Sequence, residues 1–525
     1  MTTSTIYFLL PEIVLIAAAV LIYIAGAFFQ TQKAWPWIAL TGIILAMVCL
    51  SRQNGVADSG VLQSDGFSLY LRWLNLASGL LLVLLNFRPL IKGGTQEAIG
   101  SLLLAIAGGM LVVSANDLIL LFIALELISI PTYILLYLGP GDVGCQESAA
   151  KYFFLSVLAS AILLYGFSFI YGIAGTMNLH GIRIALASLP DMPKGFDNLA
   201  KLALALTFAG LCFRLAAVPF HFYAPDVYQG TTNSNAALLS VIPKAAGLAV
   251  LVRLVWAAMS NMGPFAWQIT MAVSILTMTL GNTMALWQDN PRRMMAYSSI
   301  AHAGYLLIGL AAALAMRNDP SPGPWYGIEA MLFYLCVYAI ATLGTFAVLE
   351  LLGQPSRRIE SIDELAGLGR TRPAAAAMMA VFMFSLTGIP PLAGFWGKLQ
   401  IFGSALCVFD GAGQHLHSWF TGLAIVGVLN AAISAGYYLR IVGVMYFRAT
   451  SAASRAEGGF GVWTAAVACA LVTVFIGFYP RPLVKASNQA RPVISQTPKI
   501  EKTLEIGEFR NPFNVSLYAD YAFRV

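Results

Sequence analysis

Long apolar stretches follow one another along almost the whole chain, separated by short polar segments. A helix needs roughly 20 apolar residues to cross the hydrocarbon core of a bilayer, and about fourteen stretches approach this length. The pattern therefore predicts an all-α polytopic membrane protein with about fourteen transmembrane helices. The predicted spans are residues 6–29, 35–51, 67–87, 97–115, 117–138, 150–174, 199–217, 235–259, 268–287, 295–316, 327–351, 374–409, 417–446 and 460–479.

The predicted seventh and twelfth spans contain similar proline motifs. Residues 215–221 read Leu-Ala-Ala-Val-Pro-Phe-His, and residues 386–392 read Leu-Thr-Gly-Ile-Pro-Pro-Leu. Proline removes a helical hydrogen bond and clashes with the preceding turn, so each span should be broken there. Broken backbone at membrane depth survives only where protein or water covers it, and paired breaks in two halves are typical of inverted-repeat transporters. We expect two inverted repeats with broken seventh and twelfth helices.

Composition agrees with a membrane protein and narrows the functional classes. The 525 residues are 59% hydrophobic and only 10% charged, against about 25% charged in soluble proteins. The net charge of +6 does not indicate nucleic-acid binding, because no dense basic patch occurs. The six cysteines are scattered singly without a C-x-x-C pair, which argues against iron–sulfur and zinc sites. No two histidines share ligand spacing with a carboxylate, so we predict no metal.

Four segments describe the expected organisation of the chain. They are an N-terminal three-helix segment (1–96), a first antiporter-like repeat (97–259), a second repeat (260–446), and a last span with a polar tail (447–525). The part of the tail after residue 480 is punctuated by proline, and we expect it to be loosely ordered. Lys and Arg collect in the connections on one side, which places that side in the cytoplasm and the N-terminus opposite.

Charged side chains inside apolar spans are the candidate functional residues. Burying a charge in hydrocarbon costs roughly 2.5–3.5 kcal/mol on the insertion scale, so Glu126, Arg214, Lys244 and Lys398 need partners or a function. Glu12, near the start of the first span, is instead expected close to the membrane interface.

The four charges suit different tasks. Desolvation disfavours a charged ammonium, so Lys244 and Lys398 could take up and release protons. The Arg214 guanidinium cannot deprotonate, and we interpret it as a fixed cation paired with Glu126. Glu126 begins a polar stripe with Ser129, Tyr133 and Tyr137 on an apolar helix. Alternative interpretations are a carboxylate that joins two helices, a lysine that snorkels to the interface, and an arginine at the membrane surface.

His302 lies in the tenth predicted span, with Ser298 and Tyr305 on the same helical face. A lone histidine on an apolar helix is either a satisfied core group or part of a proton relay, and the pattern alone leaves both open. Asn430, Ser434 and Tyr437 form a comparable polar stripe on the thirteenth span.

Several motifs resemble one family of membrane proteins. The segments Val218–His221, Ala224–Gly230 (Ala-Pro-Asp-Val-Tyr-Gln-Gly), Ala296–Tyr305 and Leu386–Lys398 are similar to motifs of subunit N of bacterial NADH-quinone oxidoreductase. This family corresponds to subunit 2 of mitochondrial complex I, and the resemblance covers roughly residues 6–480.

The resemblance implies a proton-pumping, antiporter-type subunit. It places the family's fifth-span glutamate on Glu126 and its eighth- and twelfth-span lysines on Lys244 and Lys398, and one of the matching motifs contains His302. The family's seventh-span lysine falls on Arg214, which is a departure. The implied mechanism couples Lys244 to the Glu126–Arg214 pair and passes protons through His302 to Lys398.

The resemblance also implies a setting. The chain has no nucleotide, flavin or iron–sulfur motif, so it would act as a subunit of an H⁺-translocating NADH:quinone oxidoreductase. It would bind no cofactor itself, with NAD, FMN, iron–sulfur clusters and quinone in partner subunits. Expected partners are the antiporter-like subunit M, small membrane subunits and the lipid bilayer, in the cell inner membrane. The alternatives are a subunit of an Mrp-like cation/proton antiporter and a passive membrane scaffold.

Overall fold

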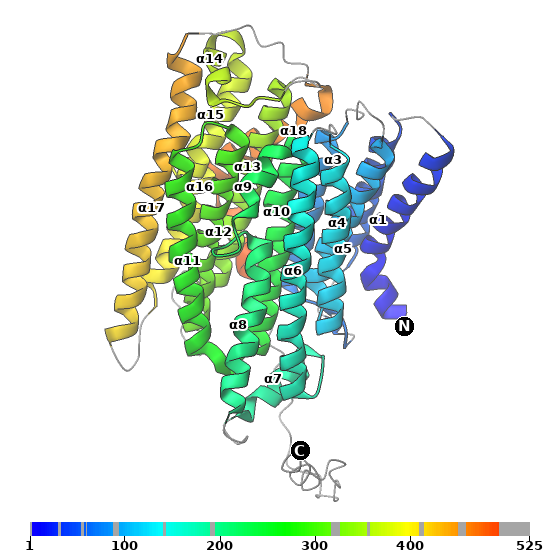
Figure 1. The fold of residues 1–525 in the computed structure, drawn as a ribbon, viewed down its shortest axis with the longest axis vertical. Coiled ribbons are helices and arrows are strands. Elements are labelled where there is room, and N and C mark those ends of the chain that lie inside the picture. The colour runs from blue at the N-terminus through cyan, green and yellow to red at the C-terminus, as the bar shows by residue number, and fades with distance from the viewer. Residues whose placement is uncertain are drawn as a thin grey trace, which may run out of the picture. The chain divides into compact units, whose positions relative to one another are not determined.

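The computed structural model describes most of the chain up to residue 492, and residues 1–493 form one compact unit of packed helices (Figure 1). The described residues are 3–29, 33–53, 57–58, 60–87, 94–139, 143–189, 195–316, 326–353, 358–408, 414–449 and 458–492.

Helices account for nearly all of the regular structure in these ranges. The α-helices are α1 (Thr3–Phe28), α2 (Trp35–Ser51), α3 (Gly66–Leu85), α4 (Thr95–Ser114), α5 (Leu118–Tyr137), α6 (Val143–Ala174), α7 (Leu179–Ala187), α8 (Phe196–Leu215), α9 (Tyr223–Gly230), α10 (Asn233–Val250), α11 (Gly263–Leu286), α12 (Pro291–Ala315), α13 (Gly327–Leu352), α14 (Leu368–Thr371), α15 (Pro373–Thr387), α16 (Ala393–Leu406), α17 (Gln414–Phe447), α18 (Phe460–Phe478) and α19 (Arg481–Gln489). A π-helix, η2 (Leu251–Ala258), continues α10, and η3 (Ser260–Met262) and η4 (Ile362–Leu365) are 3₁₀ turns. Strands β1 (Ala57–Asp58) and β2 (Gln63–Ser64) pair antiparallel.

The predicted membrane-spanning helices are confirmed by length and composition. Twelve helices of the described residues are long and apolar enough to cross a bilayer, and α2 and α15 are shorter apolar helices. Together they match the fourteen predicted spans. The twelfth span is short because it is divided into α15 and α16. The fold is thus a polytopic all-α membrane protein, as predicted.

Both predicted helix breaks are present, and they are built in the same way. Helix α8 ends before Ala216 (φ 54°) and α15 ends before Gly388 (φ 92°), each in the left-handed region. In both, the N–H of the following residue, Ala217 or Ile389, donates a hydrogen bond to the carbonyl five residues earlier, which gives a carbonyl at the end of the helix its partner. Gly388 tolerates this conformation, whereas Ala216 bears a cost of roughly 1–2 kcal/mol. The prolines then lie in the connection to α9 or α16.

The two broken helices occupy the same place in two successive groups of helices. The first group runs α4, α5, α6, α8/α9 and α10, and the second runs α11, α12, α13, α15/α16 and α17. Polar side chains cap several of these helices at their N-termini, with Asp117 at α5, Thr232 at α10 and Asn290 at α12. This order agrees with two repeats, while the four-segment division of the chain stays a prediction.

Two buried ion pairs that the sequence did not reveal hold the N-terminal helices: one joins α1 to α3, and the other joins the start of α3 to η2. Glu12 is only 2% exposed and accepts a hydrogen bond from Arg72 Nη2 at 2.7 Å. A cation from α3 thus pairs with the Glu12 carboxylate inside the protein, which agrees with a structural role, while its position close to the membrane interface stays a prediction. Arg253 on η2 makes a two-point contact with Asp65, at 2.8 and 2.7 Å. Asp65 also caps α3.

Removing the cation of the Arg253–Asp65 pair should be strongly destabilising. Both side chains are almost fully buried, so Arg253→Met leaves a carboxylate inside the protein without its cation, which typically costs about 3–5 kcal/mol. Thermal unfolding in detergent should show the loss. Arg440→Met is the matched control, because the Arg440–Asp289 pair is exposed and should contribute less than about 1 kcal/mol. Equal shifts in the two variants would contradict the prediction.

The first part of the polar tail is ordered, contrary to expectation. Residues 481–489 form helix α19, and Leu483 and Val484 pack against a buried cluster that contains Phe333 and Ile476. The apolar face of this short helix supplies the burial that a loose segment would lack. The predicted tail beyond residue 492 lies outside the described residues.

Candidate functional site

The first half of the site is an ion pair between α8 and α5. Arg214, in the last turn of α8, donates from Nη2 to Glu126 Oε1 at 2.9 Å, so the expected pair is present. The guanidinium also donates to Ser129 Oγ and to Ser160 Oγ of α6, the latter at 3.2 Å. Ser160 in turn donates to Glu126 Oε1 at 2.6 Å. Three helices therefore hold one charge pair through a shared network of hydroxyls.

The two members of this pair are not equally enclosed. The Arg214 side chain is 2% exposed, whereas the Glu126 side chain is 24% exposed. Further along the predicted stripe, Tyr133 donates to Ser156 Oγ at 2.8 Å, while Tyr137 is 63% exposed and stands apart. The stripe thus contributes Glu126, Ser129 and Tyr133 to one region, and its last member points away.

Lys244 lies on α10 but its ammonium faces the second group of helices. The residue is 1% exposed, and Nζ donates to the backbone oxygen of Ser299 and, at 2.6 Å, to Ser299 Oγ on α12. Tyr338 OH on α13 lies at 3.5 Å, with its ring 4.9 Å from Nζ. Lys244 makes no hydrogen bond with Glu126 or Arg214 in these described residues. The backbones still approach closely, because a Cβ at Gly247 would lie 3.1 Å from Arg214 Cβ.

His302 is enclosed by two tyrosine hydroxyls from different helices. Nδ1 lies 2.6 Å from Tyr334 OH on α13, and Nε2 lies 2.9 Å from Tyr438 OH on α17. Of the two neighbours expected from the helical face, Ser298 bonds to Tyr438 rather than to the histidine. The Tyr305 ring lies 5.7 Å from the imidazole ring. Both imidazole nitrogens therefore have a hydroxyl partner that can donate or accept.

Lys398 donates a hydrogen bond to a backbone carbonyl group at the break in the twelfth span. Nζ donates to the carbonyl of Thr387, the last residue of α15, at 2.8 Å. It also lies 5.1 Å from the centre of the Tyr305 ring. Glycine suits position 388 beside it because the backbone there is left-handed (φ 92°), and a Cβ would also come within 2.9 Å of Lys398 Cδ. The broken helix thus supplies both a free carbonyl and the space for the lysine.

An amide and hydroxyl network lies behind Tyr305. Asn282 Nδ2 contacts Tyr305 OH at 2.9 Å and Asn430 Oδ1 at 3.2 Å, and Tyr437 OH donates to Asn282 Oδ1 at 3.0 Å. Asn430 and Tyr437, from the stripe predicted on the thirteenth span, therefore face this network, and Ser434, which donates to its own helix, also interacts with Tyr305.

Sequence reasoning missed several polar partners in this region. Tyr334 and Tyr338 are four residues apart on α13 and, with Thr342, follow one helical face. The same periodicity argument that singled out Glu126 could have identified them. The four-residue spacing also reaches Ser160 on α6, after Tyr152 and Ser156, and Tyr438 on α17, after Asn430 and Ser434. Packing between helices then decides which of these hydroxyls lie beside the site.

A second ion cluster lies where α9 begins. Asp226 accepts hydrogen bonds from Lys151 of α6 at 2.7 Å and from Arg293 of α12 at 2.6 Å. Lys151 also pairs with Glu147 at 2.6 Å. The cluster ties the half-helix after the first break to helices from both groups.

This cluster should make stability depend on pH in acid. Burial raises the pKa of the Asp226 carboxyl, but the hydrogen bonds and charges of Lys151 and Arg293 outweigh it, so the pKa lies below its ordinary value. A lowered folded-state pKa stabilises the protein above the ordinary carboxyl range, and this contribution is lost as the pH falls below about 4. Thermal unfolding should therefore separate wild type from Asp226→Asn at neutral pH and not in acid. A difference that is independent of pH would contradict the assignment.

Comparisons with known proteins identify the family of this chain. The family model described as NADH:quinone oxidoreductase/Mrp antiporter, TM, matches residues 115–435. Proteins named NADH-quinone oxidoreductase subunit N from Rhodospirillum rubrum and Paramagnetospirillum magneticum are each 36% identical to the chain over 92% of its length, and the matches cover 96% and 97% of those proteins.

Solved structures show the same fold. A chain of respiratory complex I from Thermus thermophilus matches with a TM-score of 0.73 and 31% identity, over 90% of this chain and 98% of that one. A chain of the Mrp complex from Dietzia sp. matches with a TM-score of 0.74 over 93% of this chain and 97% of that one. Its 21% identity shows a shared fold only.

The fold and the site together define an antiporter-like polytopic membrane protein, with buried titratable side chains beside two broken helices. More particularly, the chain belongs to the NADH:quinone oxidoreductase/Mrp antiporter transmembrane family, within its subunit N branch.

Proposed function

We propose that this chain is a proton-translocating membrane-arm subunit of an NADH-quinone oxidoreductase. The observation that carries the proposal is the row of buried side chains Lys244, His302 and Lys398, each bonded to hydroxyls or backbone oxygens. Such groups can accept and pass protons inside a low-dielectric interior. The likeness to subunit N proteins and to a chain of Thermus respiratory complex I supports the assignment to a multisubunit membrane complex.

The proposed path begins at the Glu126–Arg214 pair. Arg214 keeps its charge, so the variable part of this pair is its contact with Glu126. When the pair opens, a carboxylate becomes available to a neighbouring cation, and the helix that carries Lys244 packs against Arg214 at Gly247. An opposite charge within about 4–6 Å favours the charged form of an amine. Opening and closing would therefore alternately favour proton uptake and release at Lys244.

Side chains on the second group of helices would carry the proton laterally, from Lys244 to Lys398. Lys244 contacts Ser299 and Tyr338, the Tyr338 ring lies 4.9 Å from the His302 ring, and Tyr305 lies between His302 and Lys398. Hydroxyls can donate and accept in either direction, so reorientation of these groups, with water where contacts are open, would connect the two lysines. Glu126, Arg214, Lys244, His302 and Lys398 are the proposed functional residues.

Redox chemistry would occur elsewhere in the complex. NAD, FMN, iron–sulfur clusters and quinone belong to partner subunits in this proposal, and the chain acts as part of a translocase through electrostatic coupling. Its neighbours would be the antiporter-like subunit M and small membrane subunits, in the bacterial inner membrane with the N-terminus on the non-cytoplasmic side.

Purification of the native assembly tests this assignment. The tagged full chain, extracted with a mild detergent, should bring with it iron–sulfur proteins and NADH oxidation activity. The rival assignment, a subunit of an Mrp-like cation/proton antiporter, has weaker support, since the Mrp likeness shows the fold alone. Recovery of antiporter subunits without any redox protein would favour the rival and overturn the proposal.

A further inference from the structure

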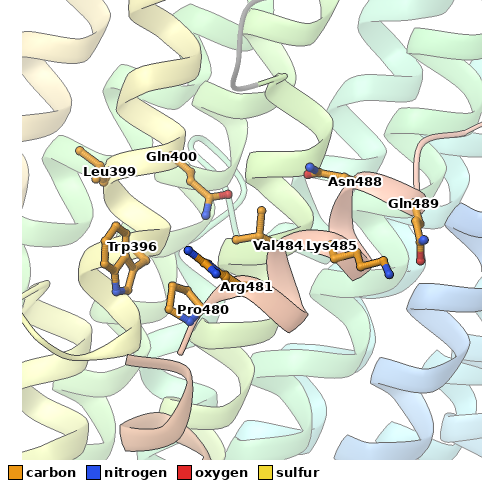
Figure 2. A pocket seen from close by; sticks show the side chains of 9 residues that line it. All are labelled: Trp396, Leu399, Gln400, Pro480, Arg481, Val484, Lys485, Asn488 and Gln489. Atoms are coloured by element: carbon orange, nitrogen blue, oxygen red, sulfur yellow. The ribbon is translucent and has the colours of Figure 1, made fainter. Parts of the chain in front are cut away.

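Helix α19 separates two cavities of similar size on the described helical unit. The first, about 500 Å³, lies between α16 and α19 and is lined by Trp396, Gln400, Arg481 and Lys485, among others (Figure 2). The second, also about 500 Å³, lies between α3, α13 and α19. Gln489 lines both, so the cavities adjoin near the end of α19.

The first cavity carries positive charge that no described residue neutralises through an ion pair. Arg481 and Lys485 are one helical turn apart and both are exposed. Figure 2 shows Arg481 extending toward Trp396 and Gln400, and Lys485 extending toward Gln489. Among the described residues neither cation has an ion-pair partner. The acid at this end of α13, Glu329, instead interacts with Arg491. The cavity therefore suits an anion.

The second cavity is lined almost entirely by carbon. Its walls include Leu69 and Trp73 of α3, Ile340 of α13 and Leu483 of α19. A volume near 500 Å³ falls in the range of small-ligand sites, about 300–1,000 Å³. It is too small for another transmembrane helix, which is at least about 10 Å across and about 30 Å long. The space suits flexible hydrocarbon chains rather than a further protein segment.

We propose that α19 binds an anionic phospholipid, with its head group along Arg481 and Lys485 and its acyl chains in the cavity between α3 and α13. A soluble anion would leave the apolar cavity empty, and an uncharged lipid would leave both cations unpaired. Basic pockets between transmembrane helices are a known solution for binding lipid head groups. The site also abuts α16, because Trp396 Nε1 donates to the Gly477 carbonyl at 2.9 Å, just before α19 begins.

Photocrosslinking in bilayers of defined composition tests the proposal. The full chain in its native complex is stripped of lipid and placed in phosphatidylcholine nanodiscs that contain photoreactive phosphatidylglycerol or, separately, photoreactive phosphatidylcholine. Mass spectrometry then locates the adducts. Phosphatidylglycerol adducts on α3, α13 and α19 should form in wild type and be rare for phosphatidylcholine.

Two variants separate the head-group contacts from the acyl-chain contacts. Arg481→Gln with Lys485→Gln should weaken phosphatidylglycerol binding about 30-fold, since each cation near a membrane surface contributes about one factor of five. Ala77→Trp, at an exposed position in the apolar cavity, should exclude the acyl chains while leaving both cations intact. Arg183→Gln with Lys201→Gln, on α7 and α8, is the matched control and should leave binding unchanged.

Several results would overturn the proposal. Equal labelling by the two lipids in wild type would show that charge plays no part. Unchanged phosphatidylglycerol labelling in the Arg481→Gln/Lys485→Gln protein would show that these two cations do not bind the lipid. Absence of adducts together with crosslinks from this face to another subunit would identify a protein as the occupant. Thermal unfolding of each variant confirms that the fold is intact before labelling is compared.

Discussion

The complex that carries Lys244→Ala is expected to lose coupled proton pumping altogether. Every residue of the apolar stretch of helix around Lys244 is buried, and the Lys244 ammonium is bonded to Ser299 and Tyr338. Alanine cannot hold a proton, and the remaining hydroxyls do not carry a net charge near neutral pH. Proton uptake by reconstituted vesicles, recorded together with NADH oxidation, should fall to the background level.

Two further lysine variants make this result specific. Lys201→Ala removes an exposed lysine that pairs with Asp197 within one helix turn, and it should pump normally. Lys244→Arg keeps a buried cation that cannot release its proton, and it should fail like alanine. A normal ratio of protons to electrons in Lys244→Ala would refute the assigned role of this residue.

Glu126→Ala is expected to have the second largest effect, through two separable causes. It removes the carboxylate opposite Arg214, whose side chain is 2% exposed, and leaving such a cation unpaired costs about 3 kcal/mol or more. It also removes the switchable partner of the proposed path, so pumping should be abolished. Thermal unfolding reports the first effect and vesicle acidification reports the second.

Conservative variants at this pair distinguish charge from geometry. Glu126→Gln keeps an acceptor for Arg214 and Ser160 but not the negative charge, so its fold should be largely retained while pumping is lost. Arg214→Lys keeps a fixed positive charge and should be tolerated if only a cation is needed. Severe loss in Arg214→Lys would show that the guanidinium contacts to Ser129 and Ser160 are required. Full pumping by Glu126→Gln would contradict the proposed switch.

The features that could be predicted from the sequence are those that depend on local pattern. Apolar length identified the spans, and the proline motifs identified the breaks that the structure places at Ala216 and Gly388. The Glu126–Arg214 pair was also predictable, because each charge is too costly to remain alone in hydrocarbon. These inferences need no knowledge of which helices are neighbours.

The remaining features depend on packing between distant segments. The Lys244 ammonium turns toward Ser299 because α10 lies beside α12 and α13, and no pattern within α10 specifies that choice. Glu12 is buried by a partner sixty residues away, Arg72. The π-helix η2 positions Arg253 against Asp65 and Val113, and hydrophobic periodicity does not distinguish it from a continuous α-helix.

The partners of Lys244, His302 and Lys398 have one property in common that bears on transport. In the described residues they are hydroxyls, main-chain oxygens and aromatic rings, and none is an acid. Two positive charges in this compartment would repel each other without a counter-ion to absorb the repulsion. Along the proposed path, one hydrogen ion would therefore have to leave these residues before the next could bind, so that the protons would pass one at a time.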